Sequence, residues 1–214
     1  MQRALLLSLA LALPAGAVLA TPLVNTFGAE NASALFWGLP DTAAYGQTFT
    51  LEAATPISNV SFRIGDDGTA IGYTAYVFAW DSSRAAVSGD ALFSAAGSTA
   101  GVNRAMTTYT VETGGLALGP GMYVAFLEAT SPGAAVWGAT DIDAYAGGSF
   151  VFQNNGGDAS QFGRTAWGTD PFGAQDLSFA INGVPAAVPV APALPLLATG
   201  LAALAVLRRR RRAG

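Results

Sequence analysis

Hydrophobic and polar residues alternate along several short stretches in the central part of the chain. In residues 45–52, 60–64 and 176–182, apolar side chains recur with a period of two, separated by polar or small residues. This period predicts β-strands that have one buried and one solvated face. Residues 73–80 and 122–127 are apolar at nearly every position, which predicts central strands covered on both faces. Shorter segments predict further strands at residues 91–95, 105–111, 135–139 and 149–153.

Residues that favour tight turns separate these strands. Glycine occurs with aspartate, asparagine or proline at residues 65–68, 119–121 and 154–157, and as a pair at 114–115. No segment between them has the period of an amphipathic helix. About nine or ten short strands with such turns predict an all-β fold, an antiparallel two-sheet β-sandwich of jelly-roll type, over residues 21–185.

The first 20 residues have the pattern of a secretory signal peptide. Arg3 precedes an apolar run at residues 4–13, and Pro14 follows it. Val18-Leu19-Ala20 supplies the small residues of a cleavage site, so the mature protein begins near Thr21. Two alternatives stay open, namely cleavage after the similar triplet at residues 15–17 and retention of the segment as a membrane anchor.

Residues 186–214 have a second address-like pattern. A proline-rich linker leads into an apolar stretch, and residues 188–207 carry no charge, which is about the length that a membrane-spanning helix requires. The helix itself is predicted at residues 194–207. Five arginines follow directly, and such a cluster stays on the cytoplasmic side of a membrane. The predicted cytoplasmic stop consists of Arg208, Arg209, Arg210, Arg211 and Arg212.

This tail resembles the PEP-CTERM sorting signal in its VPLPA-type variant. The sorting motif would be Val188, Pro189, Val190, Ala191 and Pro192, followed by Leu-Pro-Leu-Leu at residues 194–197 and Gly-Leu at residues 200–201. The chain departs from the variant because alanine occupies position 191 and the second proline position 192. The resemblance implies a bacterial cell-surface or exopolysaccharide-matrix protein, and it implies processing by an exosortase, a membrane enzyme that recognises this tail. A permanent single-span anchor remains the alternative.

Charge and composition exclude several classes of function. The chain contains ten arginines and no lysine, and residues 21–185 hold four of these arginines against all fourteen acidic residues, a net charge of −10. So acidic a domain repels phosphate backbones, which excludes nucleic-acid binding. Histidine and cysteine are absent, so a Ser-His-Asp triad, a cysteine nucleophile and a disulfide are excluded. We therefore expect a non-catalytic protein without a cofactor.

Two binding hypotheses stay open beside that expectation. Trp167 lies in a polar, glycine-rich segment, so we expect its ring to be exposed and able to stack on a sugar, whereas Trp80 is expected in the core. This would make the protein a carbohydrate-binding module, or a weak glycoside hydrolase, that acts on matrix polysaccharide. The second hypothesis is a structural Ca²⁺ ion held by oxygen ligands. The side chains considered for it are Asp141, Asp143, Asn154, Asn155 and Asp158.

Overall fold

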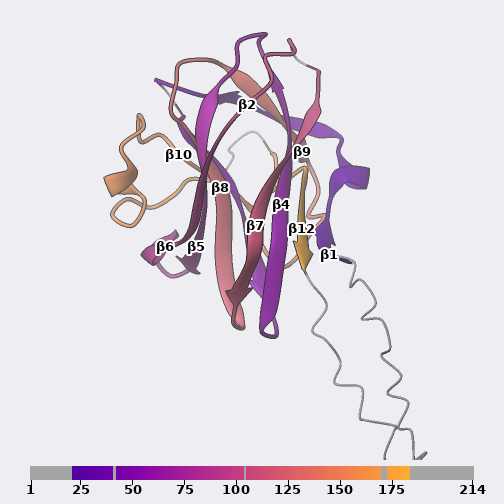
Figure 1. Cartoon of the computed structure of the whole chain (residues 1–214), viewed down its shortest axis with the longest axis vertical. Coiled ribbons are helices and arrows are strands. Elements are labelled where there is room, and N and C mark those ends of the chain that lie inside the picture. The colour runs from indigo at the N-terminus through magenta and orange to yellow at the C-terminus, as the bar shows by residue number, and fades with distance from the viewer. Residues whose placement is uncertain (1–20, 41, 104, 170–172, 184–214) are drawn as a thin grey trace, which may run out of the picture.

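The computed structural model describes residues 21–40, 42–103, 105–169 and 173–183. These residues form twelve β-strands and two short 3₁₀ helices, η1 (Phe27–Ala29) and η2 (Ala159–Gln161) (Figure 1). The strands are β1 (Thr21–Asn25), β2 (Ala32–Trp37), β3 (Ala44–Leu51), β4 (Thr55–Asp66), β5 (Gly72–Asp81), β6 (Ala86–Ser98), β7 (Thr107–Leu118), β8 (Gly121–Ala129), β9 (Ala135–Thr140), β10 (Phe150–Gln153), β11 (Asp176–Leu177) and β12 (Phe179–Gly183).

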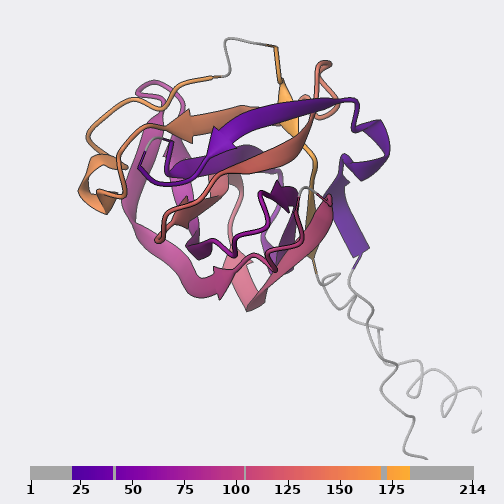
Figure 2. The ribbon, with the colours of Figure 1, turned by 90° about the horizontal axis from the view of Figure 1, so that it is seen from above.

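The strands form two antiparallel sheets that lie face to face, as Figure 2 shows from above. The first sheet has the order β1-β12-β4-β9-β11, with β2 beside β9 and β7 beside β4. Strand β4 holds this sheet together because it pairs with β7 on one side and with β12 and then β9 on the other. The second sheet has the order β10-β3-β8-β5-β6. The predicted all-β, two-sheet sandwich is therefore confirmed.

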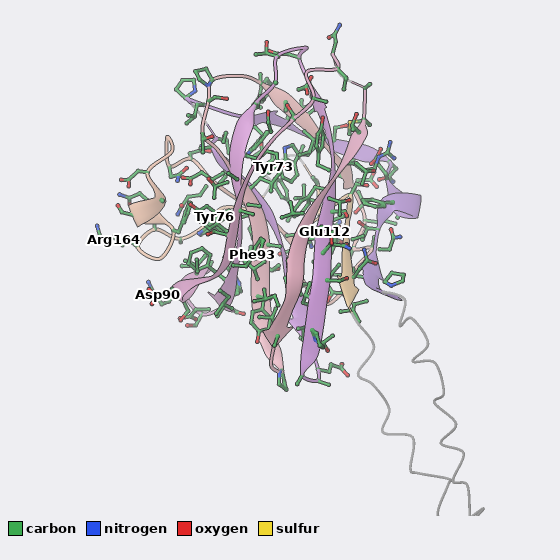
Figure 3. The ribbon with its side chains drawn as sticks, in the orientation of Figure 1. Tyr73, Tyr76, Asp90, Phe93, Glu112 and Arg164 are labelled. Carbon is green, nitrogen blue, oxygen red and sulfur yellow. The ribbon has the colours of Figure 1, made fainter. Side chains whose placement is uncertain are left out.

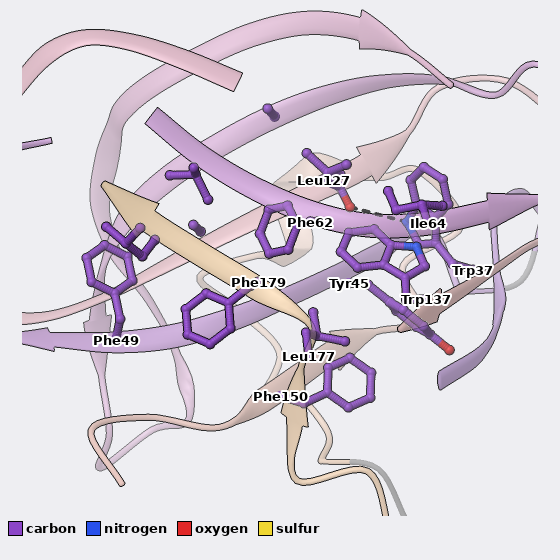
Figure 4. Packing of buried hydrophobic residues seen from close by; sticks show 14 of the residues in the cluster. Trp37, Tyr45, Phe49, Phe62, Ile64, Leu127, Trp137, Phe150, Leu177 and Phe179 are labelled. Carbon is purple, nitrogen blue, oxygen red and sulfur yellow. Dashed lines mark hydrogen bonds between the residues drawn. The ribbon is translucent and has the colours of Figure 1, made fainter. Parts of the chain in front are cut away.

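A layer of aromatic and aliphatic side chains fills the space between the sheets (Figure 4). Trp37 and Trp137 are fully buried and meet edge to face with ring centroids 5.3 Å apart. The indole Nε1–H of Trp37 donates to the Leu127 carbonyl at 3.3 Å, so one polar group that enters the core is satisfied. Other large, fully buried side chains of this layer include Phe49, Phe62, Phe150 and Phe179.

A second apolar layer covers the outer face of the β3–β8–β5 sheet. The segment of residues 154–169, here called the strap, places Phe162 and Trp167 on Phe78, Val124 and Phe126. This layer explains why residues 73–80 and 122–127 are apolar on both faces: the sandwich core lies on one side and the strap on the other. In Figure 3 Tyr76 lies on β5, and Arg164 lies toward the solvent side of the strap.

The described chain begins and ends at one place in the fold. Strand β1 pairs with β12, and Thr21 lies opposite Gly183. The predicted signal peptide (1–20), sorting motif (188–192), membrane helix (194–207) and arginine cluster (208–212) lie outside the described residues. Within the described ranges, no helix has the length and apolar character needed to cross a membrane.

Candidate binding site at the loop end

A hollow of about 250 Å³ opens at one end of the sandwich. This is the upper end in Figure 1, where β2 is labelled. The side chains around it come from the end of β2, the end of β4 and the start of β9. The described residues that line it are Leu35, Phe36, Gly65, Asp66, Asp67, Ala134, Ala135 and Val136.

A β-bulge in β2 creates the apolar rim of the hollow. Ala34 pairs with Trp137, but the next paired residue, Trp37, lies opposite Ala135, so Leu35 and Phe36 together face one residue of β9. The residues on each side of the bulge are anchored in the core, with 3% of Ala34 and none of Trp37 exposed. The chain must therefore turn the two inserted side chains outward, and Leu35 is 49% and Phe36 69% exposed.

Phe36 has an unusual backbone conformation. Its φ of 72° lies in the left-handed region, which costs a residue with a Cβ about 1–2 kcal/mol. The surroundings hold it there, because the Tyr45 hydroxyl donates to the Leu35 carbonyl and the Gly38 N–H donates to the Thr42 carbonyl at 3.0 Å. Gly38 also lies so close to Gly133 that a Cβ on Gly38 would be 2.1 Å from the Gly133 carbonyl oxygen.

Asp66 fixes the loops beneath the hollow. Its side chain is fully buried, and it accepts hydrogen bonds from the Gly68 N–H at 3.1 Å and the Gly101 N–H at 2.8 Å. Burial by itself raises the pKa of this carboxyl, but hydrogen bonds from Thr99 and from backbone N–H groups outweigh burial and lower the pKa below 3.8. Asp66 therefore stays ionised and ties the β4–β5 loop to the β6–β7 loop.

Asp67 is the exposed carboxylate of the hollow. Its Oδ1 accepts a hydrogen bond from the Thr69 N–H at 3.0 Å, which closes a tight turn. Among the described residues, its Oδ2 has no donor and is free to accept a hydrogen bond from a ligand. The hollow thus combines an aromatic ring, a small apolar floor and one available acceptor.

Among the described residues, the two carboxyls with raised pKa values lie elsewhere. Glu128 is on the outer face of β8, where burial raises its pKa while Asn155 Nδ2 donates to it at 3.1 Å. Burial also raises the pKa of Asp176, which lies between the sheets and accepts hydrogen bonds from Gln47 and from the backbone of Ala144 and Tyr145. Neither side chain lines the hollow.

The prediction that Trp167 is exposed is wrong. Its side chain is 4% exposed, its Nε1–H donates to the Phe162 carbonyl at 3.0 Å, and its ring contacts Phe126. The polar, glycine-rich sequence around it reflects the outer side of the strap, whereas the ring itself points into the sheet. Trp80 is half-buried against Trp167, with ring centroids 6.0 Å apart, at the edge of the same outer layer.

Three of the side chains considered for Ca²⁺, Asp141, Asn155 and Asp158, have separate local partners. Asp141 accepts a hydrogen bond from Asn31 Nδ2 at 2.6 Å, and Asp158 caps η2 through the Ser160 N–H at 3.0 Å. Asn155 instead contacts Glu128. In the parts of the chain that the structure describes, no three acidic, histidine or cysteine side chains gather as metal ligands.

The sequence did not predict strands β1 and β2 or the hollow. Residues 21–25 and 32–37 form β1 and β2, although neither has a clear period of two. In the second segment, three consecutive large apolar residues, Leu35, Phe36 and Trp37, interrupt any alternation. That interruption is the one sequence signal of the bulge, because a regular edge strand would place one of the three on the solvent face.

Comparisons with known proteins add little to this geometry. No protein family model and no curated protein matches the chain. A similar solved structure is that of the cysteine protease and lectin-like domains of Cwp84, a surface layer associated protein of Clostridium difficile. The match has 12% sequence identity and a TM-score of 0.39, and it covers 71% of this chain and 36% of that chain. At this level of similarity the match carries no argument about function.

Proposed function

We propose that this chain is a non-catalytic exported protein that is held at the cell surface or in the exopolysaccharide matrix and presents the loop-end hollow to extracellular ligands. The observation that carries the proposal is the placement of the hollow relative to the chain ends. The hollow lies at the Asp66 end of β4, whereas Gly183, the last described residue, lies opposite Ile57 near the other end of β4. Nine residues of strand separate these points, a distance of about 30 Å.

This arrangement suits a domain that a C-terminal tail holds at a membrane. Thr21 lies beside Gly183, so both ends of the domain face the same side. A membrane helix at residues 194–207, reached through the proline-rich linker, would hold that side nearest the bilayer. The hollow would then face outward. The strand orders β2-β9-β4-β7 and β3-β8-β5-β6 support the jelly-roll form of the sandwich for this domain.

The acid–base chemistry of the described residues favours a non-catalytic role. A glycoside hydrolase needs a carboxylic acid that keeps its proton near neutral pH, paired with a second carboxylate at a fixed distance across the substrate. In the hollow, the pKa of Asp66 is lowered and backbone N–H groups occupy its oxygens. The carboxyls with raised pKa values, Glu128 and Asp176, lie outside the hollow.

The sorting part of the proposal is tested by the intact mass of the mature protein. In cells that contain a cognate exosortase, the protein should lack residues 194–207, and in exosortase-null cells it should keep them. Replacing Pro189 and Pro192 by Ala should block processing, because a helix that extends outward would hide the scissile bond. A full tail through Gly214 in both strains would make the segment a plain anchor instead.

Surface presentation is tested by site-specific labelling, which the absence of cysteine makes simple. In exosortase-null cells, which keep the predicted membrane helix, a single cysteine in place of Val102, which is 43% exposed at the loop end, should react with a bulky membrane-impermeant maleimide. The matched variant is Ala54→Cys, in the exposed β3–β4 connection at the opposite end. It should react more slowly because the membrane lies on that side. Equal rates for the two variants would contradict the proposed orientation.

A further inference from the structure

We infer that the hollow binds an uncharged sugar ring of a polysaccharide, with Phe36 as the stacking surface and Asp67 as the hydroxyl acceptor. The inference rests on the proposed function, because an outward-facing hollow is needed to reach matrix polysaccharide. It replaces the strap as the expected carbohydrate site, since the strap buries the tryptophan that the sequence suggested. Four features of the hollow support it.

The first feature is the exposed ring of Phe36. An aromatic ring has a negative face that attracts the polarised C–H groups on the apolar face of a sugar. Phe36 is 69% exposed, so much of its surface is available to a ligand. Ala134 and Ala135 also line the hollow, and their small side chains leave room for a flat partner.

The second feature is backbone strain at this end of the molecule. Phe36 has φ 72° and Asn103, in the β6–β7 loop, has φ 43°, two of the three non-glycine residues with positive φ among those described. Strained backbone that the surrounding structure maintains is typical of ligand-binding sites. At Phe36 the strain keeps a large apolar ring in water, which stability alone does not favour.

The third feature is size. About 250 Å³ lies just below the range of sites for drug-sized molecules, roughly 300–1,000 Å³, and suits a single ring. A partner protein would need about 800 Å² of surface and roughly 20–30 residues on each side. Eight residues among those that the structure describes line the hollow. The occupant that fits is therefore a small ring at one point along a chain, rather than a protein surface.

The fourth feature is charge. The ionisable side chains among the described lining residues are Asp66 and Asp67, and the whole domain carries a net charge of −10. A uronic acid would bring a carboxylate against both, so acidic polysaccharides are disfavoured. An uncharged sugar instead offers hydroxyl donors to the free Oδ2 of Asp67. These charges select neutral over acidic sugars.

The experiment is a binding assay on the full chain with an array of neutral and uronate oligosaccharides, followed by calorimetric titration of the best binder. We expect binding to one or more neutral glycans and none to the uronates. Phe36→Gly should weaken this binding at least tenfold, since it removes the ring from a backbone that glycine adopts without strain. Asp67→Asn keeps the turn acceptor but removes the charge, and should weaken it severalfold. Leu92→Ala, at an exposed side chain on β6, is the matched control and should bind like the parent.

Four results would overturn the inference. The first three are no neutral glycan bound, tighter binding of uronates, and undiminished binding by Phe36→Gly. Light scattering tests whether a second copy of the chain occupies the hollow instead of a sugar. A parent dimer that Phe36→Gly converts to monomer would mean that the ring binds protein instead of sugar. Each of these results leaves the proposed surface location standing, because intact mass and maleimide labelling test that location independently.

Discussion

At the scale of single residues, the hollow depends on Phe36, whose neighbours hold its backbone in a conformation that a residue with a Cβ disfavours. Ala34 and Trp37 must both enter the core, and β9 offers one partner for the two residues between them. The chain therefore bulges, and Phe36 takes a left-handed conformation with its ring in solvent. A residue chosen for stability at such a position would be glycine.

Two substitutions of Phe36 distinguish the cost of its left-handed backbone from the contribution of its ring. Alanine removes the ring but keeps a Cβ in the left-handed region, whereas glycine removes both. We expect Phe36→Gly to be more stable than Phe36→Ala by about 1 kcal/mol, the reverse of the usual order in strands. Urea denaturation of the two variants measures the difference. If alanine is the more stable of the two, the backbone strain assigned to Phe36 is absent.

The lowered pKa of Asp66 predicts that the domain loses folding stability in acid. Its pKa is lowered in the folded protein, so its stabilisation is present above the unfolded value of 3.8 and disappears as the pH falls through the folded value. Asp66→Asn should destabilise the domain by about 1–3 kcal/mol at pH 6, because an amide replaces a charged acceptor of two backbone N–H groups. The loss should shrink below pH 3. Unfolding free energies at both pH values provide the check, and a loss independent of pH would contradict the assignment.

At the scale of elements, the β10-β3-β8-β5-β6 sheet protects its outer face and its edge strand in different ways. The strap covers the outer face of the β3–β8–β5 sheet with Phe162 and Trp167. On the edge strand β6, pairing with β5 is interrupted between Phe93 and Ser88, where Gly89 has φ 71° and Asp90 is exposed. Figure 3 shows Asp90 at the margin of that sheet. A bulge and a charge at an edge discourage pairing with another chain.

The strap should behave as a structural element. Trp167→Ala removes a buried ring and the indole N–H that donates to the Phe162 carbonyl, so we expect a loss of roughly 3–5 kcal/mol in unfolding free energy. Binding of neutral glycans by the folded fraction should not change. Thermal unfolding and the same glycan titration measure the two quantities. Loss of glycan binding with full stability would return the sugar site to Trp167.

At the scale of the whole molecule, the domain folds without disulfide bonds, so non-covalent packing alone must keep it folded after export. The chain has no cysteine, and its sheets are joined by a continuous core that draws on both ends of the described sequence. Buried acids are the weak points of such a domain. Burial raises the pKa values of Glu128 and Asp176, so their ionised forms are less favourable in the folded protein than in the unfolded chain.

This property predicts how stability varies with pH. For Glu128 the folded pKa lies above the unfolded value of 4.5, mainly through burial and partly through the nearby Asp158 carboxylate. Its contribution therefore favours folding below pH 4.5 and is lost as the pH rises through the folded pKa. Glu128→Gln, which can still accept from Asn155, should raise stability at pH 7 and leave it unchanged near pH 4. Equal effects at the two pH values would contradict the raised pKa.

The class of the fold and its central strands follow from the sequence, because a period of two and glycine-rich turns are local properties of the chain. Residues 45–52, 60–64 and 176–182 lie within or largely overlap β3, β4 and the β11–β12 segment. The sequence also carries the patterns of the signal peptide and the sorting tail, and these remain predictions. Composition alone, through the absence of histidine and cysteine, excludes several chemistries.

Only the packing of the sheets fixes where the hollow lies and which aromatic rings are available to a ligand. The polar neighbours of Trp167 indicate an exposed ring, yet the strap folds that ring onto Phe126. Phe36 lies in an apolar run typical of a core, yet the register between β2 and β9 expels it. In both cases exposure depends on partners that are distant along the chain. Local sequence does not specify which strands pair or in which register, so the position of the hollow is decided only when the sheets assemble.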